Sequence, residues 1–184
     1  MTHYDPIRSL HKHRFDPTQA VESDIDILDI AHALSLLSRA NGHFWQFYSV
    51  AQHCINCMME AEARGYSPKL QLACLLHDAS EAYIGDMSRP MKQHLPAFEE
   101  IERNLQAVIL RALALPELTA EEAELVRSVD DALLYHEFAA LHGDKLFDTV
   151  PAIVHTPDLA EYPHRIVENR FLSAYYLLKE LITL

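Results

Sequence analysis

The segment from Ser67 to Glu81 places the strongest constraint on how this chain folds. Ser67-Pro68 is an N-cap followed by a proline at the first helical position, which marks the beginning of a helix. From Leu70 to Leu76 the residues are apolar nearly all round the helix, and such a helix is expected to be central and buried. The sequence therefore predicts a central helix that runs from Ser67-Pro68 to about Tyr83.

Further helices are predicted on both sides of this segment by the periodic spacing of apolar residues. The predicted ranges are about 25 to 39–42, 49 to 65, 96 to 115, 119 to 141 and 166 to 181, with a loop at 85–96. Only 4 glycines occur in 184 residues, which suits helices joined by short connections better than a β-sandwich or barrel. No repeat or linker divides the chain. We predict an all-α, single-domain helical bundle of about six to seven helices over residues 1–184, with an irregular N-terminal leader at 1–22.

The charge of the chain limits its partners. With 15 Lys and Arg against 27 Asp and Glu, the formal net charge is -12, so the chain has no general basic surface for nucleic acid. An anionic small molecule must then be met locally by a metal, a few arginines or helix N-termini. No apolar run approaches the ~20 residues that span a bilayer, so no membrane partner is expected.

The three cysteines give a weaker indication. Cys54 and Cys57 have the Cys-x-x-Cys spacing of some redox and zinc sites, but no second pair completes a structural zinc site. Cys54, Cys57 and Cys74 all lie in apolar helical stretches, and we interpret them as small buried residues. Because the N-terminus also lacks an apolar signal region, a reducing, cytoplasmic location is expected.

Three ionisable residues lie at the end of the central apolar helix: His77, Asp78 and Glu81. Burying such groups costs several kcal/mol unless partners compensate them. A single His-Asp pair is also explained by a hydrogen-bonded couple within a core. His53, in the first turn of the preceding helix, and Asp130-Asp131, which interrupts the apolar pattern of a later helix, favour a shared site. Two imidazoles and two carboxylates suit one divalent cation, namely Mn, Co, Fe, Ni or Zn, with Mg as a further option.

Four ordered motifs of the chain resemble those of a known family. They are Gly42-His43 through His53, His77-Asp78 through Tyr83, Gly85-Asp86 through Lys92, and Leu125-Val126-Arg127-Ser128-Val129-Asp130. Together they resemble the H…HD…D signature of the HD-domain phosphohydrolases, in particular the YfbR-like 5'-deoxynucleotidases and their prophage-encoded relatives. The resemblance covers roughly residues 25 to 140. It implies a bundle of the HD-domain type and assigns the metal ligands to His53, His77, Asp78 and Asp130, which leaves Asp131 as a cap or salt-bridge residue.

The resemblance also implies an activity, the hydrolysis of a nucleoside 5'-monophosphate to nucleoside and phosphate with a preference for deoxyribose. Asp78 would belong to the catalytic centre as a metal ligand, and Glu81 would assist proton transfer, unless it only supports a metal ligand. Arg39 would bind the phosphate, or alternatively cap a helix C-terminus. Asp86 would meet a sugar hydroxyl, and Arg89 would be a secondary phosphate contact or plain surface charge.

Ala40 departs from the family pattern, because the bacterial housekeeping members have a tryptophan there that helps to exclude ribose. Trp45, with Phe44 and Phe47, is expected to form an aromatic wall instead, or else part of the core. The resemblance also suggests a homodimer. Two alternatives stay open: an HD-type hydrolase of another nucleotide (a deoxynucleoside triphosphate, a cyclic nucleotide or an alarmone), and a non-catalytic nucleotide-binding module.

Overall fold

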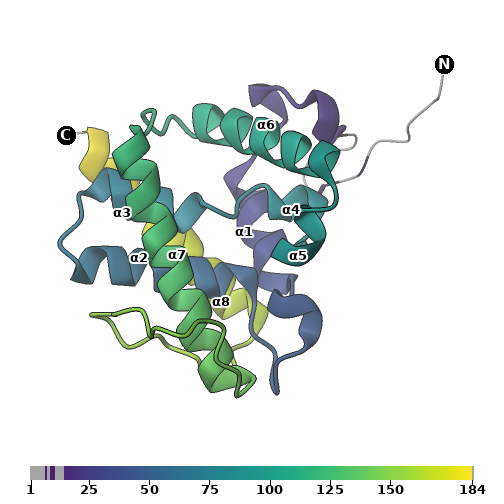
Figure 1. The fold of residues 1–184 in the computed structure, drawn as a ribbon. Coiled ribbons are helices and arrows are strands. Elements are labelled where there is room, and N and C mark those ends of the chain that lie inside the picture. The colour runs from purple at the N-terminus through teal and green to yellow at the C-terminus, as the bar shows by residue number, and fades with distance from the viewer. Residues whose placement is uncertain (1–6, 8, 11–14, 184) are drawn as a thin grey trace.

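The computed structural model describes residues 7, 9, 10 and 15–183, which form one bundle of helices (Figure 1). Within this part of the chain no β-strand occurs, and two isolated bridges join extended residues. The predicted all-α fold is therefore confirmed. In chain order the α-helices are α1 (Ile27–Leu36), α2 (Val50–Ala63), α3 (Pro68–Leu76), α4 (Glu81–Ile84), α5 (Arg89–Lys92), α6 (Pro96–Ala112), α7 (Ala120–Leu141) and α8 (His164–Thr183). The 3-10 helices are η1 (Pro17–Gln19), η2 (Glu22–Asp24) and η3 (Arg39–Gly42).

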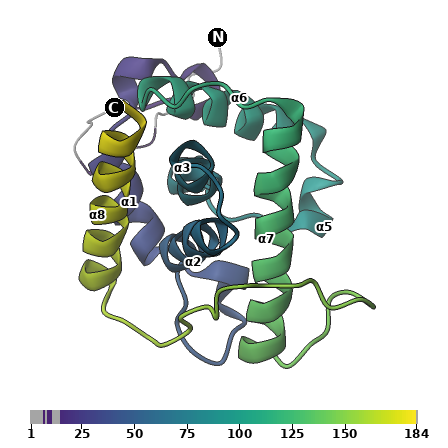
Figure 2. The ribbon, with the colours of Figure 1, turned by 90° about the vertical axis from the view of Figure 1, so that its left-hand side faces the viewer.

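Helices α2 and α3 lie at the centre of the bundle. Figure 2 shows them between α1 and α8 on one side and α7 on the other, with α6 across one end. On α3 the side chains of Leu72, Cys74, Leu75 and Leu76 are fully buried, because helices pack on several sides of it. The prediction of a central buried helix after Ser67 is confirmed, although its predicted length is wrong.

Polar caps fix where the long helices begin. The Ser67 hydroxyl accepts a hydrogen bond from the Leu70 amide at the start of α3, and the Ser49 hydroxyl accepts one from an amide in the first turn of α2. At the start of α7, Thr119 and Glu122 each accept a hydrogen bond from the other's backbone amide. Each such cap stabilises its helix by roughly 1 kcal/mol. These caps follow directly from the sequence.

The helix predicted to reach Tyr83 is interrupted after Leu76. The side chain of Gln106, on α6, enters the helix there: its Nε2 donates to the Leu76 carbonyl at 2.6 Å, and its Oε1 accepts from the Ser80 amide at 3.0 Å. In a continuous α-helix this amide and this carbonyl would bond to each other. Insertion of a side chain into the hydrogen-bond ladder is a recognised cause of helix bending. Residues 77–80 consequently form a turn, and a new helix, α4, begins at Glu81.

The first long helix also ends earlier than predicted, at Leu36 rather than near residues 39–42. Leu37 and Arg39 leave the helix because they pair with the chain that enters α2: Val50 N donates to Leu37 O at 3.0 Å, and Arg39 N donates to Tyr48 O at 2.9 Å. Arg39 therefore does not cap the C-terminus of α1. The loop predicted at 85–96 also differs, since it contains the short helix α5.

The long connection between α7 and α8 is held against one face of α2. Gln52, Asn56 and Glu60, spaced four residues apart, are all buried and point toward this connection. Glu60 accepts from the backbone amide of His155 at 2.7 Å, and Asn56 exchanges two hydrogen bonds with the backbone of Asp158, at 2.9 and 3.0 Å. These bonds satisfy polar backbone groups of a segment without regular structure.

The predicted irregular leader, residues 1–22, falls only partly within the described chain, because residues 1–6, 8 and 11–14 lie outside it. Its described part is anchored to the bundle. Phe15 is 2% exposed, and its ring centroid lies 4.6 Å from that of Tyr83. Among the residues that can be described, no helix is both long enough and apolar enough to cross a membrane.

Replacing Leu72 with alanine tests the central position of α3. The side chain is 0% exposed, so Leu72→Ala should lower the free energy of unfolding by about 2–5 kcal/mol. Leu177 on α8 is 59% exposed, and Leu177→Ala should change stability by less than about 0.5 kcal/mol. Urea unfolding followed by circular dichroism measures the free energy of unfolding of both variants. Similar losses of stability in the two would contradict the central position of α3.

Candidate metal centre

The four predicted metal ligands converge on one point inside the bundle. His53 comes from α2, His77 and Asp78 from the turn after α3, and Asp130 from α7. The Nε2 atoms of the two histidines lie 3.3 Å apart. Asp78 Oδ2 lies 3.3 Å from His77 Nε2, and Asp130 Oδ1 lies 3.2 Å from His53 Nε2. Elements far apart in sequence thus bring two imidazoles and two carboxylates together.

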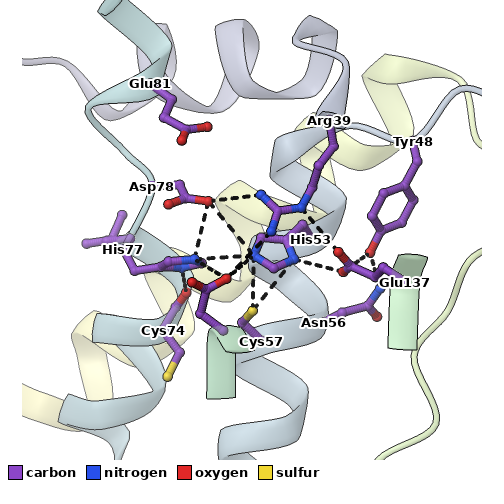
Figure 3. A network of polar contacts seen from close by, with 12 residues as sticks. Arg39, Tyr48, His53, Asn56, Cys57, Cys74, His77, Asp78, Glu81 and Glu137 are labelled. Atoms are coloured by element: carbon purple, nitrogen blue, oxygen red, sulfur yellow. Dashed lines mark hydrogen bonds and ion pairs between the residues drawn. The ribbon is translucent and has the colours of Figure 1, made fainter. Parts of the chain in front are cut away.

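Hydrogen bonds fix the orientation of both imidazole rings (Figure 3). His77 Nδ1 lies 2.8 Å from the carbonyl oxygen of Cys74, and His53 Nδ1 lies 2.8 Å from Glu137 Oε1. A carbonyl and a carboxylate only accept, so we assign the proton of each neutral ring to Nδ1. The lone pairs of the two Nε2 atoms then face each other, and such an arrangement requires a proton or a cation between them.

The spacing of these atoms fits a metal ion. Metal bonds of about 2.0–2.2 Å to nitrogen and oxygen place neighbouring ligand atoms about 2.9–3.6 Å apart. The distances from the histidine Nε2 atoms to the carboxylate oxygens run from 3.2 Å for His53–Asp130 to 3.8 Å for His53–Asp78. The carboxylate that orients His53 is a common partner of metal-binding histidines. This part of the protein can therefore hold a metal ion.

Two thiols border the same centre. Cys57 groups with His53 and His77, and Cys54 with His77 and Asp78, so that the donor atoms of each group lie within 4.8 Å of one another. Cys57 Sγ is 3.5 Å from His53 Nε2 and 3.9 Å from its Nδ1. The sulfur is therefore in contact with the side of the imidazole ring and does not lie in line with the Nε2 lone pair. Burial raises the pKa of Cys54 to about 11, which keeps this thiol neutral. The cysteines are buried, as predicted.

Arg39 joins the carboxylates of the centre. It is 7% exposed, and its guanidinium nitrogens lie 3.4 Å from Asp78 Oδ2, 3.5 Å from Asp130 Oδ1 and 3.1 Å from Glu137 Oε2. The predicted phosphate-binding arginine is therefore beside the candidate metal ligands. An anion that enters the centre meets this buried positive charge.

Glu137 is a member of the site that the sequence analysis missed. Its carboxylate is fully buried and accepts from Tyr48 OH at 2.7 Å as well as from His53 and Arg39. Burial raises its pKa, but the positive charges and hydrogen bonds of these partners outweigh burial and lower it, so the group stays ionised. Glu137 lies seven residues after Asp130, two helical turns along the same face of α7, and this spacing was a usable signal.

Asn56 and Tyr48 complete the support of Glu137. Asn56 Nδ2 donates to Tyr48 OH at 2.8 Å, and Asn56 in turn binds the backbone of the connection between α7 and α8. A chain of hydrogen bonds thus runs from that connection through Tyr48 and Glu137 to His53. No pattern in the sequence pointed to these two residues.

Glu81 faces the centre from the first turn of α4 (Figure 3). It is 4% exposed, and its Oε2 has no hydrogen-bond partner among the described residues. Burial and the negative charges of Asp78 and Asp86 raise its pKa well above the ordinary value. Lys92 Nζ is 3.9 Å from its other oxygen. Glu81 is therefore a buried carboxyl group whose surroundings favour its protonated form.

Arg89 lies at the rim of the site. Its two terminal nitrogens pair with Asp130 Oδ2, at 2.6 Å, and with Asp131 Oδ1, at 2.5 Å. Asp131 thus takes the salt-bridge role expected for it, while Asp130 faces the histidines. Arg89 is about half exposed, and this position allows its guanidinium to meet an incoming anion.

A cavity of about 600 Å³ opens beside the centre. The charged residues of its wall are Arg39, Asp78, Glu81, Asp86, Arg89, Lys92 and Asp130. The wall also includes the apolar residues Leu134, Phe138, Leu146 and Phe147. The expected role of Trp45 is wrong, because this side chain is 76% exposed and does not line the cavity. Phe138 and Phe147 form the aromatic wall instead.

Comparison with known proteins gives two relatives. The chain is 31% identical over 185 residues to the uncharacterized protein RCAP_rcc00048 of Rhodobacter capsulatus, covering 93% of this chain and 94% of that protein. It is 30% identical over 141 residues to the uncharacterized protein YfdR of Escherichia coli K12, covering 71% of this chain and 76% of YfdR. The chain belongs to their family. No sequence model of a known protein family matches it.

The charge of His77 predicts that the stability of the metal-free protein depends on pH. Burial disfavours the charged form of His77, but the nearby Asp78 and Asp130 carboxylates outweigh burial and raise its pKa well above 6.5. The resulting stabilisation should be complete below the unfolded pKa of about 6.5 and be lost as pH rises through the folded pKa. Urea unfolding of chelator-treated protein from about pH 6 to pH 9 measures it. His77→Asn should flatten the profile, and parallel profiles would refute the assignment.

Proposed function

We propose that this chain is a divalent-metal-dependent phosphohydrolase that converts (deoxy)nucleoside 5'-monophosphates to nucleoside and phosphate. The observation that carries the proposal is the pair of oriented imidazoles, whose Nε2 atoms lie 3.3 Å apart beside two carboxylates, Asp78 and Asp130, that line a cavity. The resemblance of the four motifs to HD-domain phosphohydrolases supports the same reaction. His53, His77, Asp78 and Asp130 would hold the ion.

The residues around the centre suit phosphate ester hydrolysis. The bound ion supplies Lewis-acid activation of a phosphoryl oxygen and lowers the pKa of a water. Arg39 and Arg89 offer guanidinium groups that bind phosphate oxygens in pairs. As the water oxygen bonds to phosphorus, the bond from phosphorus to the 5'-oxygen breaks. The leaving oxygen takes a proton from the Glu81 carboxyl group, whose surroundings raise its pKa and favour its protonated form, and the proton that the attacking water loses restores Glu81.

The rest of the cavity suits a nucleoside. Asp86 lies in the cavity wall, where its carboxylate can accept a hydrogen bond from a sugar hydroxyl. Phe138 and Phe147, which also line the cavity, offer apolar ring surface for a base. Ala40 adds only a methyl group to the wall, at the position where a tryptophan was expected to exclude ribose. The proposal therefore covers both ribose and deoxyribose substrates.

Charge at the rim favours one alternative substrate class. Arg89 and Lys92 line the same cavity as Arg39, so positive charge is available for more than one phosphate group. A nucleoside triphosphate is the second candidate on this ground. Product analysis separates the two, since a monophosphate releases orthophosphate, whereas cleavage of a triphosphate at the 5'-oxygen releases inorganic triphosphate.

An activity screen of metals against nucleotides tests the proposal. With Mn²⁺ or Co²⁺ the purified protein should release phosphate from nucleoside monophosphates, and His77→Ala or Asp78→Ala should abolish release. Glu81→Gln should lower kcat about 100-fold or more with little change in KM, because a proton donor is lost. Glu100→Gln, at an exposed position on α6, is the matched control and should leave kcat unchanged. A metal-loaded protein that hydrolyses no monophosphate would rule the proposal out.

A second prediction concerns the support of His53 by Glu137. Glu137→Gln keeps the size of the side chain but removes the negative charge that orients the imidazole, so Co²⁺ affinity should fall about 10- to 100-fold. Glu124→Gln, an exposed position on the same helix, should leave it unchanged. Isothermal titration calorimetry gives both values, and equal affinities would show that Glu137 does not act through His53.

A further inference from the structure

Gln106 lies outside the site described above but contacts the turn that carries two of its residues. Residues 77–80 separate α3 from α4. Hydrogen bonds between residues three positions apart, as in a 3-10 helix, hold this turn. Ala79 N donates to Leu76 O at 3.1 Å, and Glu81 N donates to Asp78 O at 3.0 Å. The longer bond between Ser80 N and Leu76 O is replaced by the carboxamide of Gln106, which bonds to both groups.

The interruption matters for the geometry of the site. Consecutive residues of an α-helix point about 100° apart around its axis. At this turn His77 Nε2 and Asp78 Oδ2 approach to 3.3 Å and face the same centre. The dihedral angles of His77 (φ -63°, ψ -33°) and Ser80 (φ -62°, ψ -29°) stay right-handed helical, while the backbone hydrogen bonds tighten to the three-residue pattern at the point where Gln106 enters. The segment that carries both side chains is therefore held by Gln106 instead of by the α-helical hydrogen bond.

Gln106 is held firmly enough to act as a fixed spacer. Its neighbours on α6, Leu105 and Ile109, are 1% and 0% exposed, so this face of α6 is anchored in the core. The groups that its carboxamide satisfies are buried as well, since Ser80 is 2% and Leu76 is 0% exposed. Loss of the carboxamide leaves two alternatives. Either a buried amide and carbonyl remain unpaired, or they bond to each other and α3 continues into α4.

We propose that Gln106 is a positioning residue, which sets the relative placement of His77 and Asp78 by keeping the helix open at residues 77–80. The inference rests on the proposed metal centre for its functional consequence. It does not depend on which nucleotide is the substrate. Either alternative removes the two hydrogen bonds by which α6 holds the turn that carries His77 and Asp78.

Gln106→Met tests the proposal, because methionine keeps the length of the side chain and removes both hydrogen bonds. The matched control is Asn104→Met, at an exposed position on the same helix. Titration with Co²⁺ alone should show affinity about tenfold or more weaker for Gln106→Met, with an altered visible absorption spectrum of the bound ion. Asn104→Met should match the wild type in both. An unchanged affinity and spectrum for Gln106→Met would overturn the proposal.

A metal-free measurement separates this inference from the proposed function. Backbone ¹³C chemical shifts of residues 76–81 should change in Gln106→Met and stay the same in Asn104→Met. If the wild type binds no Co²⁺, the proposed metal centre fails, and these shifts alone decide whether Gln106 controls the turn; unchanged shifts would overturn that role. Should Gln106→Met not fold, Gln106→Glu takes its place. It retains the acceptor for Ser80 and loses the donor to Leu76, so wild-type Co²⁺ affinity in this variant would equally refute the proposal.

Discussion

The buried charge around the two facing imidazoles is the constraint on which the rest of the site depends. Three carboxylates and one guanidinium share this volume, and the pKa of each of these carboxyl groups is lowered, so three negative charges and one positive charge leave a net charge of -2. These groups are Asp78, Asp130, Glu137 and Arg39. Burial of uncompensated charge is costly, so the site must take up either a divalent cation or two protons on the imidazoles. A bound metal ion would therefore compete with protons for the same place.

The sequence was sufficient to predict the parts of this arrangement that depend on local pattern. The apolar run before His77 predicted the central helix, and the order of the motifs predicted four residues that the structure brings together, since His77, Asp78 and Asp130 each have an atom within 3.8 Å of His53 Nε2. Glu137 escaped notice although its spacing from Asp130 was visible, because one acidic residue in a helix is ordinarily a surface residue. The prediction for Trp45 was wrong for the opposite reason: a large aromatic side chain was expected to be buried, and this one is exposed.

The remaining features depend on contacts between distant segments, which no local pattern encodes. The helix break at residues 77–80 comes from Gln106, almost thirty residues later, and a glutamine on an amphipathic helix gives no sign that it will enter another helix. Similarly, Arg39 leaves α1 because its backbone pairs with Tyr48. The connection between α7 and α8, without a regular pattern of its own, gains its place from polar residues of α2 such as Asn56.

The distribution of the site over the bundle has a consequence for folding. The donor atoms come from α2, from the turn after α3 and from α7, and the turn itself is held by α6. No fragment that lacks one of these elements contains the whole constellation, so an ion held by all of these residues would have high affinity only for the fully docked chain. A ligand that binds only the native state stabilises it by RT ln(1 + [L]/Kd), which is about 2.7 kcal/mol at a free concentration 100 times Kd. The supply of metal in the cell would then influence how much of this protein survives as well as how fast it works.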